Sequence, residues 1–178
     1  MDVPSRLTVP YKDLSVGNHH FGFRVDSRFF DAFEGSAVKG GEAAIEVDAL
    51  RKASGMILTF RIEGAVEIEC DRCLEPLLLQ IEWEGERPIL VDQQRAGEYD
   101  GEAVYVAPGE DSVDIAQWVY ESISLALPIT RVHGADADGV PLCDPDMLSR
   151  FKIVSQSEFD QMAEQSEQQT IAEKADKK

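Results

Sequence analysis

The clearest pattern in the sequence is an alternation of apolar and polar residues between residues 43 and 91. Because successive side chains of a strand point to opposite faces, a period of two predicts half-buried strands with one apolar and one polar face. A turn-forming segment at 52–55 and a cysteine-containing segment at 70–73 interrupt the alternation. We therefore expect about four antiparallel strands, arranged as a β meander or a half-open barrel. Gly64 permits a bulge or a bend within one of them.

Shorter elements are expected on both sides of this region. Residues 4–16 mix apolar positions with prolines and predict an extended arm or strand, and residues 21–25 alternate like a strand. The phenylalanine-rich segment 26–34 predicts a helical turn whose aromatic rings belong to the core. Residues 104–106 form a short strand candidate.

One amphipathic helix is expected between residues 115 and 126. Its apolar stripe recurs at helical spacing and consists of Ile115, Val119, Ser122, Ile123 and Ala126. Pro128 ends it, because the residue before a proline resists α geometry. Asp111, Ser112 and Asp114 offer candidate N-caps. The pattern as a whole predicts an α+β fold: an antiparallel sheet, one main amphipathic helix and a flexible C-terminal tail.

The sequence predicts a single domain over residues 1–151, followed by a tail. Within the domain we expect an N-terminal arm and strands at 1–40, the sheet and helix at 41–128, and a loop rich in His, Cys and Asp at 129–151. The tail, 152–178, alternates Gln, Glu and Ser with few apolar anchors. Such a composition predicts a flexible acidic segment.

The net charge of −17 is unevenly distributed along the chain. Residues 66–121 hold 15 acidic residues against only Arg72, Arg87 and Arg95. A nucleic-acid-binding protein normally presents a basic face to the phosphates, so direct RNA contact is not expected there. Two interpretations remain: the charge keeps a surface solvated, or it forms an acidic face for a basic protein partner.

The sequence favours a cytoplasmic protein without a membrane segment. No run approaches the ~18 consecutive apolar residues of a membrane span. The N-terminal residues lack the apolar segment of a signal peptide. Three cysteines, an odd number with one close pair, favour metal or redox chemistry over a secreted disulfide framework.

Cys70 and Cys73 have the spacing of half a zinc site. Cys143 and His133 would complete a tetrahedral Cys₃His centre, although nine residues between His and Cys is not a standard zinc spacing. The alternatives are that the pair forms only a tight turn and that Cys143 is a buried thiol. Redox chemistry is disfavoured, because neighbouring acids should raise the thiol pKa and no helix follows the pair.

The aspartate-rich segment 136–146 offers a weaker hypothesis. With Gly139 as the central glycine of a calcium loop, the first and last ligand positions fall on Gly134 and Pro145, so the register fails. A metal-dependent RNA-processing enzyme that uses Asp136 and Asp138 remains an alternative function. Among the enzyme motifs we tested, no nucleophile elbow, metalloprotease helix or dinucleotide fingerprint is present.

Three segments, taken in order, resemble the bacterial YceD family of large-ribosomal-RNA accumulation proteins. They are residues 66–76 with the Glu-Cys-Asp-Arg-Cys motif, residues 113–128 with the Leu-Ala-Leu-Pro motif, and residues 132–147. The resemblance covers roughly residues 40–150. It implies a role in the accumulation or maturation of large-subunit ribosomal RNA and in ribosome assembly, with no established catalytic activity.

The charge and the resemblance together lead to one hypothesis. We predict a non-enzymatic factor whose acidic face binds a basic ribosomal or ribosome-assembly protein. Any contact to large-subunit ribosomal RNA would then be indirect or confined to the more neutral N-terminal third. Zinc at Cys70, Cys73, His133 and Cys143 is the expected cofactor, if there is one. The alternatives are the RNA-processing enzyme above and a structural zinc-binding module of unrelated role.

Overall fold

The computed structural model describes residues 7–150. Its main element is an open five-stranded sheet with the strand order β2-β3-β4-β5-β6. The strands are β2 (Gly17–Val25), β3 (Val38–Lys52), β4 (Gly55–Glu69), β5 (Pro76–Val91) and β6 (Val104–Val106). Residues 43–91 form three long strands instead of the expected four or so, and with β2 they make an antiparallel meander, whereas β6 pairs with β5 in parallel. Strands β1 (Thr8–Pro10) and β7 (Ser112–Asp114) form a separate two-stranded sheet.

The long hairpins of the sheet follow from the turn chemistry between them. Strands β3 and β4 are joined by the two residues Ala53 and Ser54, and their register runs without interruption from Lys52↔Gly55 to Gly41↔Val66. The bulge that Gly64 would permit does not form there, since the register with β3 is regular at Gly64 and shifts between Val38 and Gly40 instead. A Cβ at Gly64 would lie 2.7 Å from Ala43 Cα, so this glycine permits close approach of β3.

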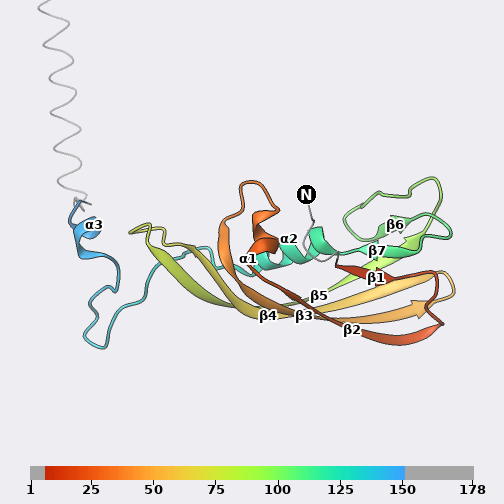
Figure 1. The fold of residues 1–178 in the computed structure, drawn as a ribbon, viewed down its shortest axis with the longest axis horizontal. Coiled ribbons are helices and arrows are strands. Elements are labelled where there is room, and N and C mark those ends of the chain that lie inside the picture. The colour runs from red at the N-terminus through yellow and green to blue at the C-terminus, as the bar shows by residue number, and fades with distance from the viewer. Residues whose placement is uncertain (1–6, 151–178) are drawn as a thin grey trace, which may run out of the picture.

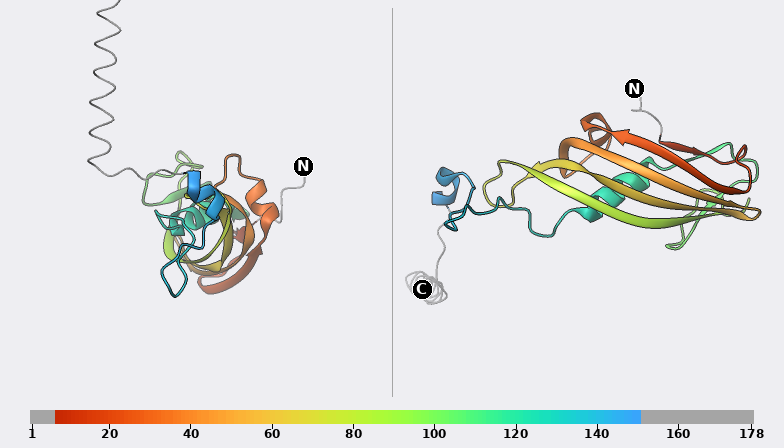
Figure 2. Two further views of the ribbon diagram at one scale, coloured as in Figure 1. Left: turned by 90° about the vertical axis from the view of Figure 1, so that its left-hand side faces the viewer. Right: turned by 90° about the horizontal axis from the view of Figure 1, so that it is seen from below.

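The apolar face of the sheet is the concave face, and helices pack against it (Figure 1). Seen end-on, the strands curve round helix α2 (Ala116–Ala126), whose buried side chains are Val119, Ser122 and Ile123 (Figure 2). The short helix α1 (Ser27–Asp31) confirms the predicted helical turn, and Phe29 and Phe30 are buried. The main amphipathic helix is thus confirmed within one residue of its expected start.

The start of α2 differs from the N-caps that the sequence offered. Asp111 and Ser112 do not cap a helix, because Ser112–Asp114 is strand β7 and Val113 pairs with Val9 of β1. Asp114 does reach the helix: its carboxylate accepts a hydrogen bond of 2.9 Å from the Ala116 N–H. Asp114 therefore has two roles: it is the last residue of β7, and its side chain accepts a hydrogen bond from the first turn of α2.

The end of the described chain contains one element that the sequence pattern did not predict. Helix α3 (Pro145–Arg150) follows the loop of residues 129–144 and has no buried residue. The expected flexible tail at 152–178 and the first residues of the N-terminal arm lie outside the described residues. No helix between residues 7 and 150 is long and apolar enough to cross a membrane.

The opposite face of the sheet is exposed and predominantly acidic. Alternate residues of β3, β4 and β5 point away from the core, as the burial pattern of each strand shows. The exposed acids of this outer face are Glu42, Glu46, Asp48, Glu63, Glu67, Glu69, Glu82, Glu84 and Glu86. The basic residues on the same face are Arg24, Lys39, Lys52 and Arg61, so the face carries a clear negative excess.

Candidate metal centre

Cys70 and Cys73 lie in a tight turn between β4 and β5. Cys70 directly follows the last residue of β4, and its carbonyl accepts a hydrogen bond of 2.9 Å from the Leu74 N–H. Its own N–H donates to the Glu75 carbonyl at 3.0 Å. Leu74 takes a left-handed conformation with φ 64°, which reverses the chain. The turn thus holds both thiols on one side, at the end of the longest hairpin.

A distant segment is tied to this turn by Asp71 and Arg131. The Asp71 N–H donates to the Arg131 carbonyl at 2.7 Å. In return, the Asp71 carboxylate accepts from the Arg131 N–H at 2.9 Å and from its Nη2 at 3.0 Å. We call this reciprocal pair the Asp71–Arg131 clasp. It fixes the backbone two residues before His133 against the cysteine turn.

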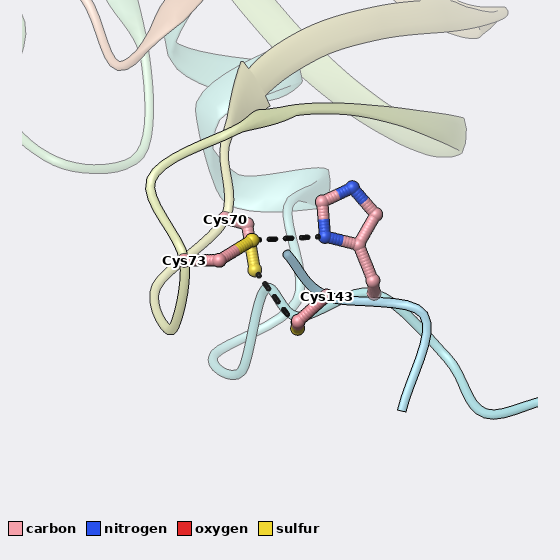
Figure 3. Close-up of side chains that lie close together, drawn as sticks. Cys70, Cys73 and Cys143 are labelled. Atoms are coloured by element: carbon pink, nitrogen blue, oxygen red, sulfur yellow. Dashed lines mark hydrogen bonds between the residues drawn. The ribbon is translucent and has the colours of Figure 1, made fainter. Parts of the chain in front are cut away.

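Four side chains converge next to the clasp. Cys70, Cys73 and Cys143 point toward one another (Figure 3), and all three are almost fully buried free thiols. Cys70 Sγ lies 3.8 Å from Cys143 Sγ, and Cys73 Sγ lies 3.4 Å from His133 Nδ1. The four ligand atoms all lie within 4.8 Å of one another, close enough to hold one metal ion.

These separations match the edges of a tetrahedral zinc site. Zinc–sulfur bonds of about 2.3 Å and zinc–nitrogen bonds of about 2.0–2.1 Å place two sulfurs about 3.8 Å apart, and a sulfur and a nitrogen about 3.6 Å apart. The observed 3.8 Å and 3.4 Å are close to both values. Three thiols and one imidazole are also a donor set that structural zinc sites use.

His133 is oriented by a second contact. Its Nε2 lies 3.1 Å from the Pro76 carbonyl, which can only accept, so Nε2 carries the proton. Nδ1 then presents its lone pair to Cys73 and the centre of the cluster. A backbone carbonyl that fixes the tautomer of a histidine is the usual outer support of a metal-ligating imidazole.

The protonation of the cluster is unusual for buried thiols. Burial raises the pKa of Cys70, but hydrogen bonds from the backbone N–H groups of Cys73, Arg72 and His133 outweigh it and bring the pKa down to about 6. Our expectation that neighbouring acids raise this pKa is therefore wrong for Cys70. Burial, followed by the adjacent thiols, raises the pKa of Cys143.

The pKa of His133 is also raised. Burial alone would lower it, but the Pro76 carbonyl and the thiols of Cys70 and Cys73 favour the imidazolium. Metal ligation requires deprotonated donors, so a bound cation would replace protons in this cluster and be favoured as the pH rises.

The structure brings together all four predicted residues and explains their irregular spacing. The Ala135↔Pro141 bridge and the hydrogen bond from the Leu142 N–H to the Gly134 carbonyl, 2.9 Å, close a small hairpin. His133 and Cys143 flank this hairpin and are thereby placed side by side. The nine intervening residues form a side loop, so the sequence spacing says little about the distance between the two donors.

The aspartates of that loop do not join the cluster. The Asp136 carboxylate accepts from the backbone N–H groups of Asp138 and Val140, at 3.0 and 2.8 Å, and so stabilises the turn. Among residues 7–150, the Cys and His cluster is the one group of three or more His, Cys, Asp or Glu residues compact enough for a metal. The described residues therefore give the RNA-processing hypothesis no ligand set in this loop.

Sequence reasoning missed the residues that position the ligands. Asp71 lies inside the cysteine motif, but we considered it only for its charge, and Arg131 was not considered. Pro76 supplies only a carbonyl, and backbone groups leave no signal in a sequence. The position of Arg131, two residues before His133, was the one available clue, because a cation near an acidic turn can form an ion pair.

The comparison with protein families agrees with the motifs. The family model described as "Large ribosomal RNA subunit accumulation protein YceD" matches residues 58–174. This match covers about two thirds of the chain and includes all four residues of the cluster. No curated protein and no solved structure matched the sequence. The chain belongs to the YceD family, whose description is large ribosomal RNA subunit accumulation protein.

Proposed function

We propose that this chain is a non-enzymatic cytoplasmic factor that supports accumulation and maturation of large-subunit ribosomal RNA. It does so by binding a basic ribosomal or ribosome-assembly protein with the acidic outer face of its sheet. The family description supports the connection with large-subunit RNA. The observation that supports a basic partner is the charge of the exposed outer face, which has nine acids and four basic residues.

The arrangement of these acids favours a binding surface over a merely solvated one. Glu63 lies directly opposite Glu82 in the β4–β5 register. Like charges in this position destabilise a sheet. Neither carboxylate has an ion-pair partner within residues 7–150, whereas Arg61 reaches Glu84 at 3.8 Å. A cationic partner would relieve the repulsion between Glu63 and Glu82.

The negative charge of the outer face favours a protein partner over naked RNA. A phosphate backbone carries dense negative charge, and affinity for it comes largely from lysines and arginines that displace its counterions. The outer face would repel it. A basic protein, in contrast, would be attracted at long range and held in register by complementary charges. RNA contact is then indirect, through the bound protein.

We further propose that zinc occupies the Cys70, Cys73, His133 and Cys143 cluster. Four protein donors complete a tetrahedron and leave no open position, which is the arrangement of structural rather than catalytic zinc. The ion would join the end of the β4–β5 hairpin to the 131–143 segment. Its effect would be to stabilise this end of the sheet, next to Glu67 and Glu69 of the outer face.

A capture experiment with charge-matched variants tests the partner. The full chain is immobilised and exposed to purified large-subunit ribosomal proteins, and separately to naked large-subunit RNA, at low and at moderate salt. We expect capture of basic proteins that weakens with salt, because screening shortens the range of surface charges. The triple variant Glu63→Gln, Glu82→Gln, Glu86→Gln should lose most of it.

The control variant carries the same charge change elsewhere. Glu34, Glu102 and Glu110 are exposed and lie outside the outer face, so their replacement by Gln alters the net charge equally. This control should retain capture. If both variants lose capture of basic proteins equally, the effect comes from net charge and not from the outer face. Capture of naked RNA in the absence of any protein would contradict the proposal.

A further inference from the structure

Strand β2 presents a long free edge of the sheet. It has nine residues, it pairs only with β3 among the described strands, and its register with β3 is regular from Gly17↔Arg51 to Val25↔Ala43. The opposite side of the sheet is different: β6 pairs only with Ile89–Val91, and the remaining outer edge of β5 is bounded by Pro76 and Pro88. Strand β2, in contrast, contains no proline and pairs with no described strand along its whole outer edge.

The register identifies the backbone groups that face outward. A two-residue hairpin loop closes on a hydrogen-bonded pair, here Lys52 and Gly55. Residues of an antiparallel strand direct their N–H and C=O groups alternately to the two neighbours, so Arg51 bonds toward Gly17 of β2. Counting along the regular register, the residues of β2 whose N–H and C=O point to the free edge are Asn18, His20, Gly22 and Arg24.

These outward groups have no hydrogen-bond partner among the backbone contacts of the described residues. Proteins usually protect such an edge with a proline, a lysine, a bulge or a covering element. Strand β2 contains no proline, no lysine and no bulge. Helix α1, which follows β2 in the chain, packs against β3 instead. An unprotected regular edge is a template for an added strand.

The surroundings of Gly22 favour a basic strand in that place. On β3, Glu46 lies opposite Gly22 and Asp48 lies opposite His20, both exposed. A Cβ at Gly22 would lie 3.7 Å from both carboxylate oxygens of Glu46, so the carboxylate lies beside the glycine on the outer face. The imidazole of His20 contacts Glu46 Oε2 at 2.7 Å and Asp48 Oδ1 at 2.8 Å, so a basic partner would share these two carboxylates with His20. A lysine or arginine on a neighbouring strand could reach Glu46 across the missing side chain. A second copy of this chain is disfavoured, because two molecules of net charge −17 repel.

We propose that the free edge of β2 binds its partner by strand addition, and that the added strand is an extended segment with Lys or Arg at alternate positions. Its backbone pairs with Asn18, His20, Gly22 and Arg24, and its basic side chains lie over the acidic outer face. This inference rests on the proposed function and adds to it the conformation of the partner and the edge that it uses.

The test uses a labelled peptide, as long as β2, that alternates lysine with threonine, and the full-length protein. Binding is measured by fluorescence anisotropy. A second peptide carries N-methyl groups on the alternate amides that face the edge, which removes hydrogen bonds but keeps the charge. We expect N-methylation to lower the affinity by at least about tenfold, since backbone bonds supply much of the affinity in strand addition.

A matched pair of protein variants tests the same contact from the other side. Gly22→Pro removes an outward N–H while leaving the β2–β3 ladder intact, and prolines are tolerated on such edges. Gly22→Ala keeps the N–H and adds a methyl group in ordinary contact with Glu46. We expect at least about tenfold weaker peptide binding for the proline variant and less than about twofold for the alanine variant.

The outcomes separate strand addition from charge alone. Equal binding of the two peptides, or unchanged binding to a folded Gly22→Pro protein, would overturn strand addition while leaving the proposed function standing. If Gly22→Pro fails to fold, the two peptides on the wild-type protein decide. A wild-type dimer that Gly22→Pro converts to a monomer would assign the edge to a second copy and overturn the inference. Failure of the wild-type protein to capture any basic ribosomal protein would instead remove the proposed function.

Discussion

The carboxylate of Asp71 and the backbone and guanidinium of Arg131 hold together two segments that lie sixty residues apart in the chain. Four hydrogen bonds of 2.7 to 3.4 Å join the pair in both directions. The bonds from Arg131, backbone before side chain, lower the pKa of Asp71, so the carboxylate stays ionised at neutral pH. The clasp is therefore a permanent charged contact at the base of the cysteine cluster.

Asp71→Ala should weaken metal binding without removing a ligand. The variant leaves all four donors in place but loosens the segment that carries His133. Supports of this kind typically change metal affinity by about 10–100-fold. Competition with a chromogenic zinc chelator measures the change. Arg72→Ala is the control, because this exposed residue lies in the same turn and its side chain makes no hydrogen bond to the described residues. An Asp71→Ala protein with wild-type affinity would show that the clasp does not position the site.

The metal content of the purified protein tests the centre itself. We expect one zinc per chain in the wild type and none in Cys70→Ser, because a hydroxyl is a poor substitute for a thiolate donor. Chelation should lower the melting temperature of the wild type and leave that of Cys70→Ser unchanged. The double variant Asp136→Asn, Asp138→Asn should keep its zinc, since these side chains lie outside the cluster. Zinc retained by Cys70→Ser, or its absence from the wild type, would refute the assignment.

The thiol of Cys70 should make the metal-free protein sensitive to pH. Its pKa is about 6 in the folded chain, below the ordinary thiol value of about 8.5. The thiolate therefore stabilises the folded state above the unfolded pKa, and this contribution is lost as the pH falls through about 6.

The titration of His133 also changes stability with pH and must be removed before the effect of Cys70 can be measured. Its raised pKa acts in the opposite sense: the stabilisation is present below the unfolded pKa and is lost as the pH rises through the folded value. The comparison is between the His133→Asn protein and the double variant His133→Asn, Cys70→Ser, both with a chelator present. The difference between their melting temperatures should increase from pH 5 to pH 9. A constant difference would contradict a lowered pKa for Cys70.

The sheet was predictable because its signal is local. In the segments around Ile45, Phe60 and Ile81, each alternate residue reports the face on which it lies, so strands β3, β4 and β5 and their acidic face follow from the pattern, although about four strands were expected there. The parallel pairing of Val104–Val106 with β5 has no such signal, since three residues can pair in either direction. Helix α3 was missed for a similar reason, because none of its side chains is buried.

The site was predictable only in its parts. The spacing of Cys70 and Cys73 is a local motif, whereas the approach of His133 to Cys143 depends on backbone hydrogen bonds within the 134–142 hairpin. Backbone bonds are independent of residue identity, so the nine-residue interval concealed the proximity. The Asp71–Arg131 clasp was hidden equally well, since an exposed acid and an arginine sixty residues apart could have many partners.

The opposed carboxylates Glu63 and Glu82 predict a conflict between stability and binding. No base within residues 7–150 neutralises either carboxylate, so Glu63→Gln should raise the free energy of unfolding by about 0.5 kcal/mol, within the range of cross-strand charge pairs. Glu102→Gln, in an exposed loop, should change it by less. The same Glu63→Gln protein should capture less of a basic ribosomal protein. Denaturant unfolding at low salt measures the first effect and capture the second. A substitution that weakens binding without stabilising the fold would show that Glu63 contacts the partner but does not repel Glu82.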